Sequence, residues 1–80
     1  MASGLLLIDC DTDQTFAIIE QARKIKGVLH GHAISMADGI FDIITRIEAK
    51  DPAGLEEIQS QILKVKGVYG TSLATINQSF

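Results

Sequence analysis

Eighty residues are enough for one small domain, which we place at 1–80, and 46% apolar against 21% charged residues indicate a packed core rather than disorder. The net charge of −3, with its basic residues scattered, argues against direct contact with nucleic acid. No apolar run approaches the roughly 20 residues of a membrane-spanning helix. We therefore expect no membrane partner. The single cysteine, Cys10, allows no internal disulfide, so we expect a protein of the reducing cytoplasm.

The first half of the chain has the pattern of a strand, a helix and a strand. "GLLLIDC" at 4–10 has the length and composition of a buried strand, and "DTDQT" after it offers side-chain acceptors for a helix start. A helix is expected over 16–25. Its buried stripe would consist of the apolar residues at three- and four-residue steps, which are Phe16, Ile18, Ile19, Ala22 and Ile25. Gly27 is expected to end this helix in the left-handed conformation, before a second strand at 28–37.

The second half repeats this order. "DG" at 38–39 predicts a hairpin turn into a third strand at 40–49. Asp51, followed by a proline at the first helical position, begins a second helix. Its stripe is expected to consist of Leu55, Ile58, Ile62 and Val65. Gly67 ends this helix, and "VYGTSLATI" at 68–76 is the predicted fourth strand.

A short repeat marks the same event in both halves. "KIKGV" at 24–28 and "KVKGV" at 64–68 each carry lysines for the negative end of a helix and a glycine to end it. Two strand–helix–strand units in tandem predict an α+β fold of the ferredoxin-like βαββαβ type. Right-handed crossovers would place both helices on one face of a four-stranded antiparallel sheet.

The other face of this sheet is expected to be bare. The third strand would expose Ile40, Asp42, Ile44, Arg46 and Glu48 there, and the second strand Val28, His30, His32, Ile34 and Met36. So much aliphatic surface is unusual for a small domain in water. We therefore expect a homodimer of the dimeric α/β-barrel kind, formed through a sheet face or edge.

Few residues in the chain suggest catalysis. His30 and His32, two apart on a strand, could share a metal with Asp42 as third ligand, or could be polar residues at a subunit interface. No cysteine or further histidine completes such a site, so we expect no metal. Cys10 lies between two aspartates, whose charges raise the pKa of a thiol and suppress a nucleophile. No catalytic motif occurs, and we expect neither an enzyme nor a cofactor.

The predicted hairpin tip, "SMADGIFD", offers a small zwitterion two kinds of partner. Backbone amides of the turn would bind its carboxylate, and Asp42 would bind its ammonium group. Hydroxyl groups on the last strand, those of Thr71, Ser72 and Thr75, would lie nearby. The alternative is an ordinary Asp-Gly turn, with threonines present for their strand propensity.

Two motifs resemble the effector domain of the Lrp/AsnC family of regulators. The first is "G-x-F-D" after the second strand, formed by Gly39, Phe41 and Asp42, and the second is "KVKGV" leading to Thr71 in the last strand. The resemblance covers nearly the whole chain, from about Leu5 onward. Full-length members carry a helix-turn-helix before this domain. Here only "MASG" precedes Leu5, so the resemblance implies a stand-alone effector domain.

The resemblance implies an amino-acid-sensing module that dimerises through its sheet, assembles into rings of dimers and modulates transcription through a full-length Lrp/AsnC regulator. Effectors of the family bind between dimers, near the hairpin. Carried over to this sequence, the ligand-binding residues are Asp38, Gly39, Phe41, Asp42, Thr71 and Ser72. Two departures bear on the ligand: the stretch from Val28 to Gly39 is longer than the family's second strand, and Leu73 replaces a second threonine.

Two other interpretations share the predicted fold. One is a small dimeric α/β-barrel enzyme of the monooxygenase or decarboxylase type, in which His30 and His32 would be the acid–base pair. The other is an ACT-like regulatory domain, which also binds amino acids.

Overall fold

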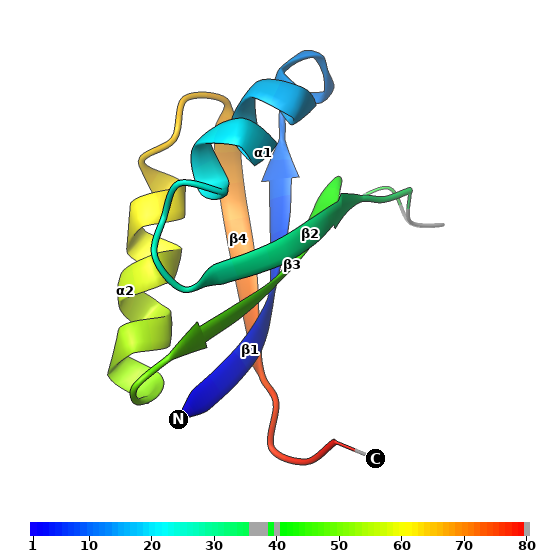
Figure 1. Ribbon diagram of the computed structural model, residues 1–80. Coiled ribbons are helices and arrows are strands. Elements are labelled where there is room, and N and C mark those ends of the chain that lie inside the picture. Colours follow the sequence, from blue (N-terminus) through cyan, green and yellow to red (C-terminus); the bar gives the residue numbers. More distant parts are fainter. Residues whose placement is uncertain (36–38, 40, 80) are drawn as a thin grey trace.

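The computed structural model describes residues 1–35, 39 and 41–79, which form a four-stranded sheet with two helices (Figure 1). The elements are β1 (Ala2–Cys10), a 3₁₀ turn η1 (Thr12–Gln14), α1 (Thr15–Ala22), β2 (Val28–Ala33), β3 (Ile43–Ala49), α2 (Pro52–Leu63) and β4 (Val68–Thr75). The strand order is β2-β3-β1-β4, and all neighbouring strands are antiparallel. The predicted ferredoxin-like fold is confirmed. Within the described residues, no helix is long and apolar enough to cross a membrane.

β1 lies at the centre of the sheet because it pairs with β3 on one side and β4 on the other. Alternate residues of β1 point into the core, where Leu6 and Ile8 are fully buried. Ile43, Thr45 and Ile47 of β3 are buried on the same face, as the alternation in the sequence predicts. The sheet therefore has one inner face, on which the core is built.

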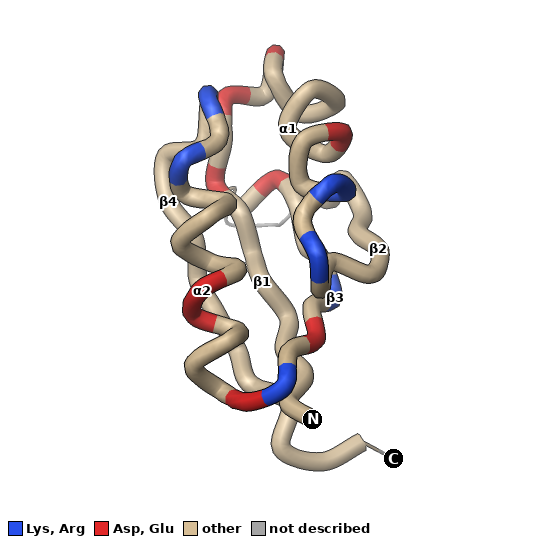
Figure 2. The backbone as a smooth tube through the Cα atoms, turned by 60° about the vertical axis from the view of Figure 1, so that its left-hand side comes forward, with Lys and Arg blue, Asp and Glu red and all other residues tan. Residues whose placement is uncertain are grey.

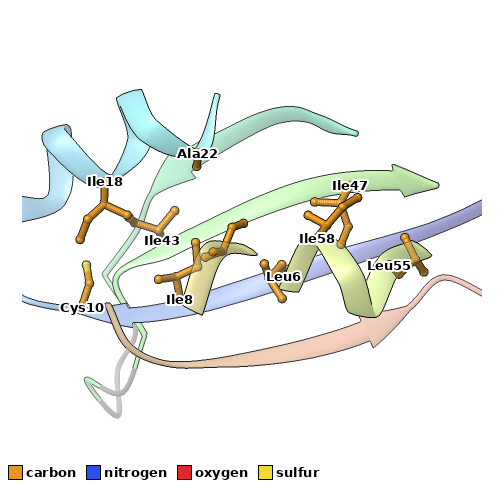
Figure 3. Packing of buried hydrophobic residues seen from close by; sticks show 10 residues of the cluster. Leu6, Ile8, Cys10, Ile18, Ala22, Ile43, Ile47, Leu55 and Ile58 are labelled. Carbon is orange, nitrogen blue, oxygen red and sulfur yellow. The ribbon is translucent and has the colours of Figure 1, made fainter. Parts of the chain in front are cut away.

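Both helices cover this inner face. α1 contributes Ile18 and Ala22 to the core, and α2 contributes Leu55 and Ile58 (Figure 3) and also Ile62. Val65, the fourth residue of the predicted stripe, lies beyond the end of α2 and packs against the core from there. Lys and Arg lie mainly along the segments that follow α1 and α2, whereas Asp and Glu lie on the helices and near the ends of the strands (Figure 2). The helix layer is thus held by apolar packing, with charges of both signs on its outside.

The repeated "KxKGV" has the same structure in both halves. Gly27 has φ +99° and Gly67 has φ +95°, the left-handed conformation predicted for a residue that ends a helix. Each glycine carbonyl accepts a backbone hydrogen bond from another segment of the chain, from Glu48 N at 2.8 Å and from Asp11 N at 2.9 Å. The repeat therefore ends a helix in each half, and its glycine carbonyl anchors the start of the next strand through a hydrogen bond.

The structural repeat extends beyond the sequence motif. Directly after each "GV", the strand register shifts by one residue, which leaves Leu29 on β2 and Tyr69 on β4 without a residue opposite them. Both of these side chains are exposed, while the preceding Val28 and Val68 pack against the core. Our expectation that Val28 shares a face with His30 is wrong, because the extra residue places them on opposite faces.

Helix α1 differs from its prediction at both ends. It covers Thr15–Ala22 rather than 16–25, and Phe16 is 83% exposed instead of buried. The core stripe passes through Ile18, and two helical residues turn the chain by about 200°, so Phe16 points to the opposite side. Asp11, among the acceptors predicted at the helix start, caps the 3₁₀ turn η1, where its side chain accepts a hydrogen bond from Asp13 N at 3.0 Å. The N-cap of α1 is Gln14, whose side chain makes no capping hydrogen bond.

The second half follows its prediction more closely. Asp51 is the N-cap of α2, and its Oδ1 accepts a hydrogen bond from Gly54 N at 2.9 Å. The hairpin strands are shorter than predicted, since β2 ends at Ala33 and β3 begins at Ile43. Of the predicted "DG" turn, Gly39 has φ +70°, and Asp38 lies outside the described residues.

Candidate functional site

Asp42 joins the hairpin to the end of β1. Its backbone N–H donates to Ile8 O at 2.9 Å, and its Oδ2 accepts from Cys10 N at 3.2 Å. The same residue's carbonyl accepts from Ile34 N at 2.8 Å. Asp42 is half-buried. One carboxylate oxygen of the predicted ligand-binding aspartate therefore has a partner within the chain, which leaves Oδ1 as its candidate acceptor for a ligand.

Cys10, next to this aspartate, is an inert thiol. Its side chain is buried, and its Sγ lies 4.0 Å from Thr15 Oγ1. Burial raises the pKa of the Cys10 thiol, the hydrogen bond with Thr15 opposes the rise, and the carboxylates of Asp42, Asp9 and Asp11 add to it. A thiol that holds its proton at neutral pH is a poor nucleophile, in agreement with the prediction from the sequence.

The described part of the hairpin tip is open to solvent. Gly39 is exposed, and a Cβ atom built on it would have no neighbour within 4 Å. Phe41 is half-buried. Asp38, the remaining predicted ligand residue of the hairpin, lies outside the described residues. Gly39 is therefore exposed near the tip of the hairpin, and Asp42 lies half-buried three residues further along the chain.

The two predicted residues of β4 point to opposite faces. Thr71 lies opposite Ile8 and faces the helix layer, where its Oγ1 accepts from Gln59 Nε2 at 2.9 Å. Ser72 lies opposite Leu7 and faces the other side. Ile8 also pairs with Ile43 of β3, so two strand spacings, about 9.6 Å, separate Thr71 from the start of β3. Within one chain, Ser72 therefore lies on the face that the helices leave uncovered, and Thr71 does not.

The face that the helices leave uncovered is apolar at its centre. Leu5 and Leu7 of β1 lie there opposite Arg46 and Ile44 of β3, and all four are half-buried. The edge strands contribute His30 and His32 on β2 and Ser72 and Ala74 on β4, of which only Ala74 is apolar. We call this set of eight residues the open face. Its aliphatic centre and mixed rim match the composition of a protein–protein contact.

The sequence did not point to a groove of about 650 Å³ on the helix side of the molecule. It lies beside α2 and the end of β3, over Ile58 and Ala49, with Lys26, Lys50, Glu48 and Glu57 among its lining residues. α1 has eight residues and α2 has twelve, so the shorter helix covers less of this side. The signal for the groove in the sequence is this difference in helix length. It was missed because the first helix was predicted to continue to residue 25 and ends at Ala22.

Comparison with known sequences gives one informative relative. No model of a known protein family matches the chain. A stretch of 69 residues is 36% identical to part of a homocitrate synthase from Sulfurisphaera tokodaii and takes in 85% of this chain. The match covers 14% of the length of that enzyme. This chain therefore spans only a small part of the curated relative that it resembles.

Comparison with solved structures establishes the fold. TTHA0845 from Thermus thermophilus superimposes with a TM-score of 0.88 at 21% identity, over 100% of this chain and 98% of that one. AsnC from E. coli gives 0.85 at 10% identity, over 98% of this chain and 52% of its own. The siroheme decarboxylase NirDL gives 0.87 at 13% identity, over 98% and 26%. A transcription regulator and an enzyme thus share this fold.

Proposed function

We propose that the chain is a regulatory module that binds an amino acid and assembles through its open face. The observation that carries the proposal is the open face itself, an apolar surface beside Gly39 and Asp42 in a domain with the fold of AsnC. A second copy laid on this face would remove its aliphatic centre from water. Each Å² of apolar surface so buried contributes about 25 cal/mol.

The assembly also completes the ligand site. In one chain Gly39 and Asp42 are open on one side, so a partner surface is needed to enclose a small molecule. The backbone N–H of Gly39 binds the carboxylate of the amino acid, and Asp42 Oδ1 accepts from its ammonium group. Ser72 supplies a hydroxyl on the same face. Ligand binding and assembly are thereby coupled, because the ligand prefers the state in which its site is closed.

The partner of such a module is a larger protein that contains the same domain. This domain fold makes up 52% of the AsnC chain, which supports co-assembly with a full-length Lrp/AsnC-type regulator and an effect on transcription without direct DNA contact. The 36% identity with a segment of a homocitrate synthase supports a second kind of partner, a biosynthetic enzyme. In both cases the domain acts as the effector-binding part of the assembly.

A second candidate function is catalysis of the decarboxylase type. It is favoured by the two histidines and the arginine of the open face, since His30 lies opposite Arg46, and by the fold shared with NirDL. His30 and His32 would supply the acid and base, and Arg46 would bind an anionic substrate. Turnover that disappears in the His30→Gln, His32→Gln double variant would favour this function. Amino-acid binding that survives in the same variant would favour the regulatory one.

Calorimetric titration with each of the twenty amino acids tests the regulatory proposal. We expect one of them to bind saturably and Asp42→Asn to weaken this binding about tenfold or more, because a charge-assisted hydrogen bond is lost. The asparagine retains an acceptor for Cys10 N, so the fold is kept. Asp13→Asn, at an exposed position on η1, is the matched control and should bind as the unaltered chain does. Equal binding by both variants would remove Asp42 from the site.

A further inference from the structure

The two histidines of the chain form a pair on the open face. His30 and His32 lie two residues apart on β2, opposite Arg46 and Ile44, so both imidazoles stand on the same side of an edge strand. Their ring centroids are 6.0 Å apart, with an angle of 67° between the ring planes. Both residues are exposed, and within the described part of the chain no further strand lies beyond β2. The pair is accessible from water without any opening of the fold.

This separation suits two ligands of one metal ion. Imidazole nitrogens bind Zn²⁺ at about 2.0–2.1 Å, which places the centroids of two coordinating rings roughly 5–6 Å apart. Side-chain rotations of exposed residues therefore suffice to bring both rings onto one ion. Because both ligands come from one strand, the backbone already holds them at the required spacing.

The geometry points to a bidentate site for one divalent transition-metal ion, chelated by His30 and His32 at the edge of the open face. Neutral imidazole suits Zn²⁺, Cu²⁺ and Ni²⁺, and not Mg²⁺ or Ca²⁺, which prefer oxygen. This inference does not depend on the proposed amino-acid response. It replaces our sequence-based expectation that the chain has no metal site.

The other coordination positions are supplied from outside the chain. Among the described residues there is no group of three or more histidine, cysteine or acidic side chains suited to a metal. Asp42, which the sequence offered as a possible third ligand, uses its Oδ2 to accept from Cys10 N at 3.2 Å. Water or the same histidine pair of a second copy would fill the remaining positions. In the second case, four imidazoles would complete a tetrahedral site between two copies.

Arg46 gives the site a diagnostic property. It lies opposite His30, so its positive charge opposes a cation bound to the pair. The charge is half-exposed and partly screened by salt, which weakens binding without preventing it. Removal of the charge by Arg46→Gln should therefore tighten metal binding, and more so at low ionic strength.

Titration of the metal-free chain with Zn²⁺, followed by calorimetry and by NMR of the imidazole resonances, tests the site. The chain has only two histidines, so binding through imidazole reports on this pair alone. We expect one Zn²⁺ per chain, or one per two chains if copies share it. His30→Gln and His32→Gln should each abolish saturable binding, Arg46→Gln should tighten it several-fold, and Glu56→Gln, on the exposed side of α2, should leave it unchanged.

A register control separates chelation from the mere presence of two histidines. The double substitution His32→Ala, Ala33→His keeps the composition but moves one imidazole to a position opposite Ile43, on the inner face. This variant should lose Zn²⁺ binding. Zn²⁺ that binds equally well to this variant or to the double glutamine variant would overturn the inference. So would the absence of saturable binding to the unaltered chain.

Discussion

At the scale of single residues, Asp42 has one role in the fold and a second, proposed role in ligand binding. Its Oδ2 accepts a hydrogen bond from the backbone of Cys10, and its Oδ1 is the proposed partner of an ammonium group. The first role belongs to the fold, because the bond ties the start of β3 to the end of β1. A substitution that removes the whole carboxylate therefore affects stability and binding together, and two variants are needed to separate them.

Asp42→Ala should lower the free energy of unfolding by about 1–3 kcal/mol, because it leaves Cys10 N without its acceptor. Asp42→Asn should lower it by less, since its amide oxygen can accept the same bond. Urea denaturation followed by circular dichroism measures both. If the alanine variant is as stable as the asparagine variant, the bond to Cys10 N does not contribute to stability.

Cys10 gives a second prediction at this scale. Burial raises the pKa of its thiol in the folded chain, so the folded state holds the proton at a pH where the unfolded state releases it. The free energy of unfolding should therefore fall as the pH rises above the ordinary thiol value of about 8.5. Iodoacetamide at pH 8 should alkylate the native thiol far more slowly than the urea-unfolded one. Equal rates would show that Cys10 is accessible.

At the scale of elements, the repeated "KxKGV" explains most of the fold. Gly27 and Gly67 have nearly the same left-handed φ. Each follows two lysines and precedes a valine that packs against the core. The surroundings of the two glycines differ. A Cβ atom on Gly27 would come within 2.5 Å of Glu48 O and 2.6 Å of Ile58, whereas on Gly67 it would meet the flexible Gln14 side chain at 3.1 Å.

Gly67→Ala should destabilise the chain by about 1–2 kcal/mol through backbone strain alone. Gly27→Ala should cost roughly a further 1–3 kcal/mol, because a backbone oxygen cannot move aside as a glutamine side chain can. Gly70→Ala is the control, since a Cβ atom there has no neighbour within 4 Å. Thermal unfolding of the three variants measures the order of their stabilities, which should be Gly70→Ala, then Gly67→Ala, then Gly27→Ala from most to least stable. A Gly70 variant as unstable as Gly27→Ala would contradict it.

Periodicity and end signals predicted the elements well, because helix stripes, caps and glycine stops are local properties of the chain. Asp51, Gly27 and the stripe of α2 were predicted correctly for this reason. The extra residues at Leu29 and Tyr69 were missed, since a register shift is decided by the neighbouring strand. The face of Thr71 depends on the same shift.

The candidate site was less predictable than the fold. The sequence places Gly39 and Asp42 close together, but the bond from Cys10 N to Asp42 joins residues 32 positions apart. No local pattern contains such a contact. Likewise, the distance between the hairpin and β4 follows from the central place of β1 in the sheet, which sets two strand spacings between them.

At the scale of the whole molecule, the open face is the surface that our proposals share. Its aliphatic centre lies on the side of the sheet opposite both helices, and an 80-residue domain gains stability from covering it. Assembly, the closing of the ligand site and the proposed metal site all involve this one surface. Changes on this face should therefore alter the oligomeric state, while equivalent changes on the helix side should not.

Ile44→Asp should convert the assembly to monomers, because it places a charge at the centre of a contact that excludes water. Leu63→Asp, at an exposed position on α2, is the matched control and should leave the assembly intact. Analytical ultracentrifugation of the two variants distinguishes these outcomes. A dimer that survives Ile44→Asp and dissociates with Leu63→Asp would place the contact on the helix side.

We propose above all that an amino acid controls assembly through the open face. Size-exclusion chromatography with light scattering, run without and with a mixture of the twenty amino acids, tests it most directly. At a protein concentration at which the free chain is partly dissociated, the active amino acid should raise the mean mass of the particle, because its site closes only when copies meet on the open face. A particle whose mass is the same under both conditions would contradict the claim.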